Sequence, residues 1–133
     1  MLNRMFSGKV VPNRRNGTRF GYPTANMMIS DKEVDGLFVG YTSLISAENK
    51  KIEELFSGKM PSLVFIGKAQ TVGEVDHRLE SHILDFPEID LYGCELSVEI
   101  AEKLRDNLVF TSEAELVSQM KKDEVDARKW FNK

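Results

Sequence analysis

The sequence of 133 residues is poor in cysteine and has no long hydrophobic run. Its single cysteine, Cys94, excludes an internal disulfide framework and suits a reducing compartment. No apolar stretch approaches the roughly 20 residues that a transmembrane helix requires. The first residues also lack the apolar stretch of a signal peptide. We therefore expect a cytoplasmic protein without a membrane partner.

Several common signatures of site chemistry are absent as well. The sequence contains neither a G-x-x-x-x-G-K-[ST] loop nor a G-x-G-x-x-G fingerprint, the two commonest phosphate cradles. No cysteine and histidine cluster has zinc spacing. His77 and His82 are not accompanied by a serine or cysteine in a nucleophile elbow. These absences argue against a serine hydrolase.

Composition and length are those of an ordinary globular protein. Hydrophobic residues make up 41% and charged residues 29% of the chain. A chain of 133 residues fits one domain better than two, so we expect residues 1–133 to form a single domain.

The charge is unevenly distributed along the chain. The net charge is −3, yet the first 30 residues contain five basic residues and no acidic one. This basic quarter could bind an anion or could be a solvated face, and charge alone supports both interpretations. The acidic remainder argues against a protein that binds nucleic acid.

Short extended segments dominate the chain up to about residue 104. Apolar, β-branched or alternating patterns predict strands at residues 5–11, 37–45, 63–66, 79–86 and 94–100. Glycine and proline punctuate the gaps between them. Several strands with turn signals and one closing helix suggest a small antiparallel barrel.

The last part of the chain predicts an amphipathic helix. Ser112 and Glu115 have the spacing of a capping box, in which each side chain satisfies the other residue's backbone donor. Apolar residues follow at helical spacing: Leu116, Met120, Ala127 and Phe131, flanked by Val117 and Trp130. We expect this stripe to cover the barrel. A second, shorter helix at residues 48–56 is an alternative to a loop there.

Residues 17–26 carry the strongest local signal. Thr24 and Asn26 are two residues apart, so both side chains face the same side of an extended segment. A hydroxyl and an amide oxygen are hard ligands that suit Mg²⁺ bound to nucleotide phosphates. The segment could equally be a tight turn into a strand, and its chemistry alone leaves both interpretations open.

The order of motifs resembles that of riboflavin kinases over nearly the whole chain. The matching segments are Gly8-x-Val10-Val11, Gly17-x-x-x-Gly21-Tyr22-Pro23-Thr24-Ala25-Asn26, Asp35-Gly36-Leu37-Phe38, Ile66-Gly67, Leu79-Glu80-Ser81-His82-Ile83-Leu84-Asp85-Phe86, Leu91-Tyr92-Gly93, Leu104-Arg105 and Phe110-Thr111-Ser112. The Pro-Thr-Ala-Asn segment together with the Glu-Ser-His strand is a specific pair.

The resemblance implies a mainly β fold, a six-stranded antiparallel Greek-key β-barrel with a C-terminal α-helix. It makes Glu80 the catalytic base and makes Thr24 and Asn26 the Mg²⁺ ligands, with Thr24 also touching the ATP phosphates. Without the resemblance, Glu80 could simply be a surface strand residue. The positions that match nucleotide contacts are Asn13, Thr18, Thr24, Ile83, Asp85 and Tyr92, and those that match flavin contacts are Arg105 and Met120.

The activity implied by the resemblance is that of a riboflavin kinase, which converts riboflavin and ATP into FMN and ADP. We expect a monomer that needs Mg²⁺ and stops at FMN, because nothing before residue 5 resembles the domain that makes FAD in many bacterial relatives. Two alternatives remain. One is a catalytically weak flavin-binding module of the same fold, and the other is an oligonucleotide-binding barrel that uses the basic first quarter.

The sequence departs from the family in its loops. Asn13 stands where the family usually has glycine, and Thr18 stands where a basic residue is common. Residues 65–71 differ from the usual mid-chain motif, and residues 46–60 are longer than the usual hairpin. These differences motivate the flavin-binding alternative.

Overall fold

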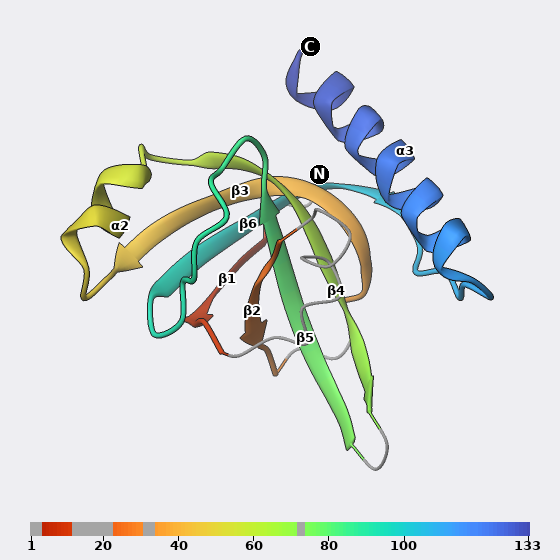
Figure 1. Cartoon of the computed structure of the whole chain (residues 1–133), viewed down its shortest axis with the longest axis horizontal. Coiled ribbons are helices and arrows are strands. Elements are labelled where there is room, and N and C mark those ends of the chain that lie inside the picture. Colours follow the sequence, from red (N-terminus) through yellow and green to blue (C-terminus); the bar gives the residue numbers. More distant parts are fainter. Residues whose placement is uncertain (1–3, 12–22, 31–33, 72–73) are drawn as a thin grey trace.

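The computed structural model describes residues 4–11, 23–30, 34–71 and 74–133 (Figure 1). Within these residues the chain forms six strands, two helices and the loops between them. The strands are β1 (Arg4–Lys9), β2 (Ala25–Met28), β3 (Gly36–Ser46), β4 (Met60–Thr71), β5 (Glu74–Ile83) and β6 (Glu95–Arg105). The helices are α2 (Lys50–Leu55) and α3 (Glu113–Phe131).

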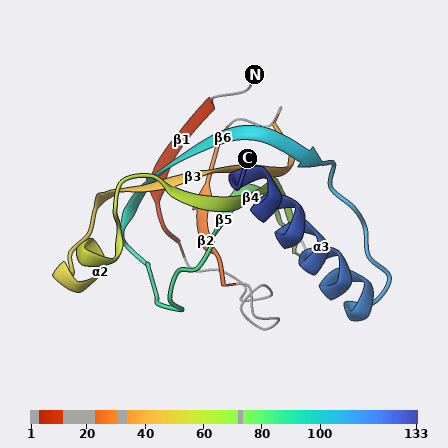
Figure 2. The same cartoon turned by 90° about the horizontal axis from the view of Figure 1, so that it is seen from above.

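The strands form one antiparallel sheet that curves into a nearly closed barrel (Figures 1 and 2). Their order is β1-β6-β3-β4-β5-β2, so β3, β4 and β5 are consecutive neighbours and β6 returns to pair with β3. This return is the Greek-key connection. A bridge between Val11 and Asn26 links the end of β1 toward β2. The predicted six-stranded Greek-key barrel with a C-terminal helix is confirmed.

The strands bury side chains on two sides of the barrel wall. On β6, Leu96, Val98 and Ile100 point inward and are fully buried, as their period-2 pattern predicts. On β3, Phe38 belongs to this inner core, whereas Leu37 and Val39 belong to a second cluster with Ala127 of α3. The start of β3 is buried on both faces, which fits its continuous apolar run Leu37-Phe38-Val39.

Helix α3 lies along the outside of the barrel (Figures 1 and 2). Ser112 is its N-cap and accepts a hydrogen bond from the backbone N–H of Glu115 at 3.2 Å. The other predicted hydrogen bond of the capping box, from the backbone N–H of Ser112 to the Glu115 carboxylate, is shifted by one residue. The Glu115 carboxylate accepts from the backbone N–H of Thr111 at 3.1 Å, one position before the cap. The Thr111 hydroxyl also donates to this carboxylate, and this second contact keeps the Glu115 side chain next to Thr111.

Of the helix and the loop predicted as alternatives for residues 48–56, the structure has the helix, α2, which is capped by Asn49 and anchored by buried Ile52. The predicted strands differ from the observed ones in their boundaries. The strand predicted at residues 63–66 is part of the longer β4. The strand predicted at residues 79–86 ends at Ile83, because Asp85 has a positive φ of 58° and turns the chain.

Candidate active site

Pairing of β2 with β5 brings two distant motifs together. Asn26 is opposite Glu80 in the antiparallel register. Thr24 Oγ1 donates to Glu80 Oε1 at 3.3 Å, and Asn26 Nδ2 donates to Thr24 Oγ1 at 3.2 Å. Asn26 is buried and Glu80 is half-buried. The three residues predicted as base and metal ligands therefore form one hydrogen-bonded cluster.

The surroundings of Glu80 make its carboxylate a better proton acceptor than an exposed one. Burial raises the pKa of Glu80, while the hydrogen bond from Thr24 and the charge of Arg78 lower it to a smaller extent. A raised pKa moves a carboxyl group closer to the range useful for general base catalysis near neutral pH. Thr24 meanwhile holds one carboxylate oxygen in position.

The donor set of the cluster fits Mg²⁺ bound to a nucleotide. It offers a hydroxyl, an amide and one carboxylate, all hard donor groups. Among the residues that the structure describes, there is no group of three or more His, Cys, Asp or Glu that could hold a metal ion by itself. A cation here would depend on ligand phosphates for most of its charge compensation.

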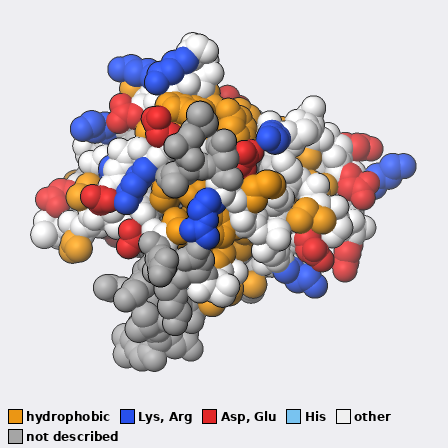
Figure 3. Space-filling view, turned by 180° about the vertical axis from the view of Figure 1, so that it is seen from behind, with side chains coloured by type: hydrophobic (Ala, Val, Ile, Leu, Met, Phe, Trp, Pro, Cys, Tyr) orange, Lys and Arg blue, Asp and Glu red, His pale blue; other side chains and the backbone are white. Residues whose placement is uncertain are grey.

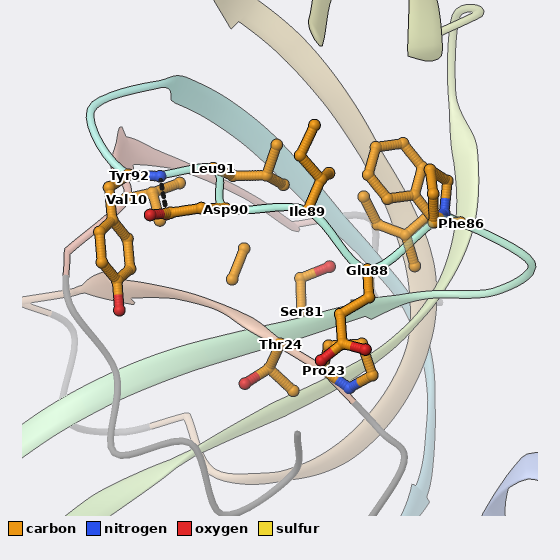
Figure 4. A pocket seen from close by; sticks show the side chains of 13 residues that line it. Val10, Pro23, Thr24, Ser81, Phe86, Glu88, Ile89, Asp90, Leu91 and Tyr92 are labelled. Carbon is orange, nitrogen blue, oxygen red and sulfur yellow. Dashed lines mark hydrogen bonds between the residues drawn. The ribbon is translucent and has the colours of Figure 1, made fainter. Parts of the chain in front are cut away.

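A cavity of about 200 Å³ opens beside this cluster (Figure 4). Thr24 belongs to both, since it lines the cavity and binds Glu80. The apolar lining comes from barrel residues such as Val10 and Ile83, and residues 86–92 form the facing wall. The cavity therefore brings apolar side chains next to the polar Thr24–Asn26–Glu80 cluster.

The predicted nucleotide contacts divide into three groups. Ile83 and Tyr92 line the cavity together with Thr24. Asp85 does not line it, because both of its carboxylate oxygens accept from Arg128 of α3, at 2.9 and 3.1 Å. This ion pair lowers the pKa of Asp85. Asn13 and Thr18 lie outside the described residues.

The predicted flavin contacts lie on β6 and α3. Arg105, the last residue of β6, donates from Nε and Nη2 to the two carboxylate oxygens of Asp123 at 2.9 and 2.7 Å. Its Nη1 donates to the Asp106 carbonyl oxygen at 3.0 Å. Asp123 is buried and also accepts from Gln119. Met120 is half-buried on the same helix.

Sequence reasoning missed several residues of the site. Ser81, Glu88 and Asp90 line the cavity, and Asp123 holds Arg105. Asp123 did leave a signal, because it occupies an otherwise apolar helical stripe, where an acid needs a buried partner. His82 Nδ1 is 2.8 Å from the Pro23 carbonyl oxygen, and Cys94 is buried.

Charged side chains on the surface are mixed. On the face shown in Figure 3, Lys and Arg side chains alternate with Asp and Glu around hydrophobic ones, where described residues form the surface. No helix in the described part of the chain is long and apolar enough to cross a membrane.

Comparison with known proteins relates this chain to riboflavin kinases. The family model for flavokinase, described as riboflavin kinase, matches residues 2–131. The bifunctional riboflavin kinase/FMN adenylyltransferase of Escherichia coli is 33% identical over 129 residues, covering 94% of this chain and 37% of that protein. This chain therefore spans less than two fifths of that relative's length.

Two solved structures share the fold. Riboflavin kinase from Trypanosoma brucei superposes with a TM-score of 0.65 at 22% identity, over 97% of this chain and 80% of that one. A Streptococcus pneumoniae structure described as a macrolide-efflux protein has a TM-score of 0.75 at 30% identity, over 96% of this chain and 39% of that one. From the family match, together with the fold and the Thr24–Asn26–Glu80 cluster, we conclude that the chain belongs to the riboflavin kinase family.

Proposed function

We propose that this chain transfers the γ-phosphate of ATP to the terminal ribityl hydroxyl of riboflavin, giving FMN and ADP. The observation that carries the proposal is the Thr24–Asn26–Glu80 cluster beside a cavity, in a chain of the riboflavin kinase family. We also propose that the enzyme is a cytoplasmic monomer and that it does not bind nucleic acid.

In this reaction Glu80 is the general base. Its carboxylate accepts the proton of the ribityl hydroxyl as that oxygen forms a bond to the γ-phosphorus and the bond to the β-phosphate oxygen breaks. The hydrogen bond from Thr24 fixes which carboxylate oxygen is engaged and leaves the other available. Mg²⁺, which the oxygens of Thr24 and Asn26 would hold, supplies neutralisation of phosphate charge when bound.

The remaining predicted contacts take distinct places. The cavity lined by Thr24, Ile83 and Tyr92 receives ATP. Asp85 contributes through the turn it forms, because Arg128 occupies both of its oxygens. Arg105 and Met120 contact riboflavin. The ion pair and the Asp106 contact use three of the five N–H donors of Arg105, which leaves two for the flavin.

Product analysis tests the proposal. Riboflavin, ATP and Mg²⁺ should give FMN and ADP in equal amounts, and ADP release should cease when riboflavin is omitted. Flavin binding without ADP release, across several nucleotides and metal ions, would favour the catalytically weak flavin-binding module. Steeply salt-dependent binding to single-stranded oligonucleotides would instead favour the nucleic-acid alternative.

A further inference from the structure

Three buried hydroxyl groups from three strands form a hydrogen-bonded chain that ends at the cavity. Thr42 on β3 lies between Ser62 on β4 and Ser81 on β5, with Oγ1···Oγ distances of 2.8 and 2.6 Å. Ser62 and Thr42 are fully buried, and Ser81 is 2% exposed. This network connects the interior of the barrel to the cavity lining through Ser81.

The direction of the hydrogen bonds in this chain follows from its far end. Ser62 Oγ is also 2.8 Å from the Met60 carbonyl oxygen, which can only accept. Each hydroxyl can donate one hydrogen bond. Ser62 donates to the Met60 carbonyl oxygen, so it must accept a hydrogen bond from Thr42. Thr42 therefore donates to Ser62 and must accept from Ser81. The proton of Ser81 therefore points to Thr42, and Ser81 Oγ offers only acceptor lone pairs in the cavity that it lines.

The position of Ser81 determines which part of ATP it meets. The phosphates belong near Thr24, beside the base and the cation-binding oxygens. Glu88 and Asp90 also line the cavity, and their carboxylates would repel phosphates where they lie. The apolar lining of Val10, Ile83 and Leu91 is left for the nucleobase. Ser81 also lines the cavity (Figure 4), and it shares a face of β5 with Ile83, two residues further along the strand.

We infer that Ser81 determines nucleobase specificity, because Thr42 and Ser62 hold its oxygen as an acceptor that selects a base bearing an amino group. The inference rests on the proposed function. Adenine presents its 6-amino group as a donor, whereas hypoxanthine presents an oxygen at the same position, which a fixed acceptor repels. A buried acceptor left unpaired or facing another acceptor is costly, so one such group discriminates strongly.

The decisive test changes Thr42, which does not line the cavity. Thr42→Val has nearly the same shape but no hydroxyl, so the Ser81 proton loses its acceptor and can turn to the base. We expect the ratio of kcat/KM for ATP to that for inosine triphosphate to be at least about tenfold in the parent. It should fall about tenfold in Thr42→Val, mainly through improved use of inosine triphosphate. Thr42→Ser keeps the hydroxyl and should keep the ratio.

Further variants keep the test conclusive. Ser81→Ala should reduce the ratio by lowering kcat/KM for ATP, and Ser97→Ala on β6 is a matched serine control outside the chain of hydroxyls. If Thr42→Val does not fold, Ser62→Ala frees the same proton one step further away. A ratio that is identical in the parent, Thr42→Val and Ser81→Ala would overturn the inference.

Equilibrium binding of ADP and inosine diphosphate separates this inference from the proposed function. Binding that favours ADP in the parent and loses that preference in Thr42→Val supports Ser81 as the selector, even in a chain without turnover. Turnover of riboflavin with equal kcat/KM for both triphosphates would support the proposed kinase activity and contradict only the role assigned to Ser81.

Discussion

Glu80 illustrates how a functional residue can oppose stability. Its carboxylate is half-buried, with Thr24 as a hydrogen-bond donor and Arg78 as a nearby positive charge. Burial still dominates and raises the pKa of Glu80. The folded chain therefore binds this proton more readily than the unfolded chain does. Folding stability from this group is present at low pH and decreases as pH rises through the folded-state pKa.

Glu80→Gln should consequently raise the melting temperature at pH 7 while abolishing the proposed turnover. Glutamine keeps the shape and can still accept from Thr24, but it carries no charge to bury. We expect a gain of roughly 0.5–2 kcal/mol, typical of relieving a functional site. Thermal melts between pH 4 and 8 measure it. The difference should shrink as pH falls, because the parent's Glu80 then takes up a proton and has no charge left to bury.

An exposed glutamate provides the control for this prediction. Glu102→Gln on β6 should leave the melting temperature nearly unchanged across the same pH range. A lower melting temperature for Glu80→Gln than for the parent at pH 7 would show that the charged form is stabilised in the fold, contrary to our assignment.

Single residues were predictable from sequence where a motif carries them, and not where a role depends on a partner. Thr24, Asn26 and Glu80 stand in recognisable segments, and the structure brings them together. Ser81 is adjacent to Glu80 in sequence, yet its role depends on Thr42 and Ser62 from two other strands. No local pattern contains that information.

At the scale of elements, the Arg105–Asp123 and Arg128–Asp85 ion pairs both join α3 to the rest of the fold, and the two pairs differ in burial. The Arg105–Asp123 pair is largely enclosed, with side-chain exposures of 21% and 7%. The Arg128–Asp85 pair is open, with exposures of 40% and 77%. Removing one partner of a buried pair leaves an uncompensated charge, whereas exposed pairs contribute little.

Arg105→Ala should therefore reduce the free energy of unfolding by about 3–5 kcal/mol, because it leaves the Asp123 carboxylate buried and unpaired. Arg128→Ala should cost less than about 1 kcal/mol. Urea unfolding of both variants measures the contrast. Replacing both partners, as Arg105→Met with Asp123→Leu, should recover most of the lost stability. Equal losses for Arg105→Ala and Arg128→Ala would contradict this account of how the helix docks.

Elements were predictable where periodicity extends over enough residues. The stripe from Leu116 to Phe131 predicts α3, and the alternation before Ile100 predicts β6. The four-residue strand β2 is too short to show a pattern, and it becomes a strand only by pairing with β5. The spacing of Ser112 and Glu115 also does not give the exact cap of α3, since the Glu115 carboxylate accepts from Thr111, one residue before the N-cap.

The whole molecule combines an inner core with a second core beneath α3. Ala127 is fully buried in that second cluster, and Trp130 and Phe131 pack against it. Tyr41 of β3 extends the contact, with ring centroids 5.5 Å from Phe131 and 6.5 Å from Trp130. Because β3 contributes to both clusters, loss of the helix contact should weaken the barrel wall itself.

The prediction of one domain can be tested on this basis. Trp130 is the single tryptophan, so its fluorescence reports specifically on the docking of α3. Fluorescence and far-UV circular dichroism should give coincident urea transitions, as expected for a small cooperative domain. A tryptophan transition at clearly lower urea than the circular dichroism transition would show that α3 undocks from a barrel that stays folded.

The architecture as a whole could be predicted only through the family resemblance. Strand patterns and turn residues indicate a barrel, but the pairing of β6 with β3 joins segments about 60 residues apart, and nothing local specifies it. The two parts of the site, near residues 24 and 80, lie equally far apart in sequence and meet through β2–β5 pairing. Non-local hydrogen bonding thus determines both the fold and the site.

The most direct test of the central claim compares the parent chain with Thr24→Ala and Glu80→Gln for conversion of riboflavin to FMN with ATP and Mg²⁺. We predict FMN formation by the parent and a loss of about 10²–10⁴-fold in kcat for Glu80→Gln, with riboflavin binding retained. Thr24→Ala should lose turnover and also require more Mg²⁺. Turnover by Glu80→Gln equal to that of the parent would contradict the assignment of the base and of the site built around it.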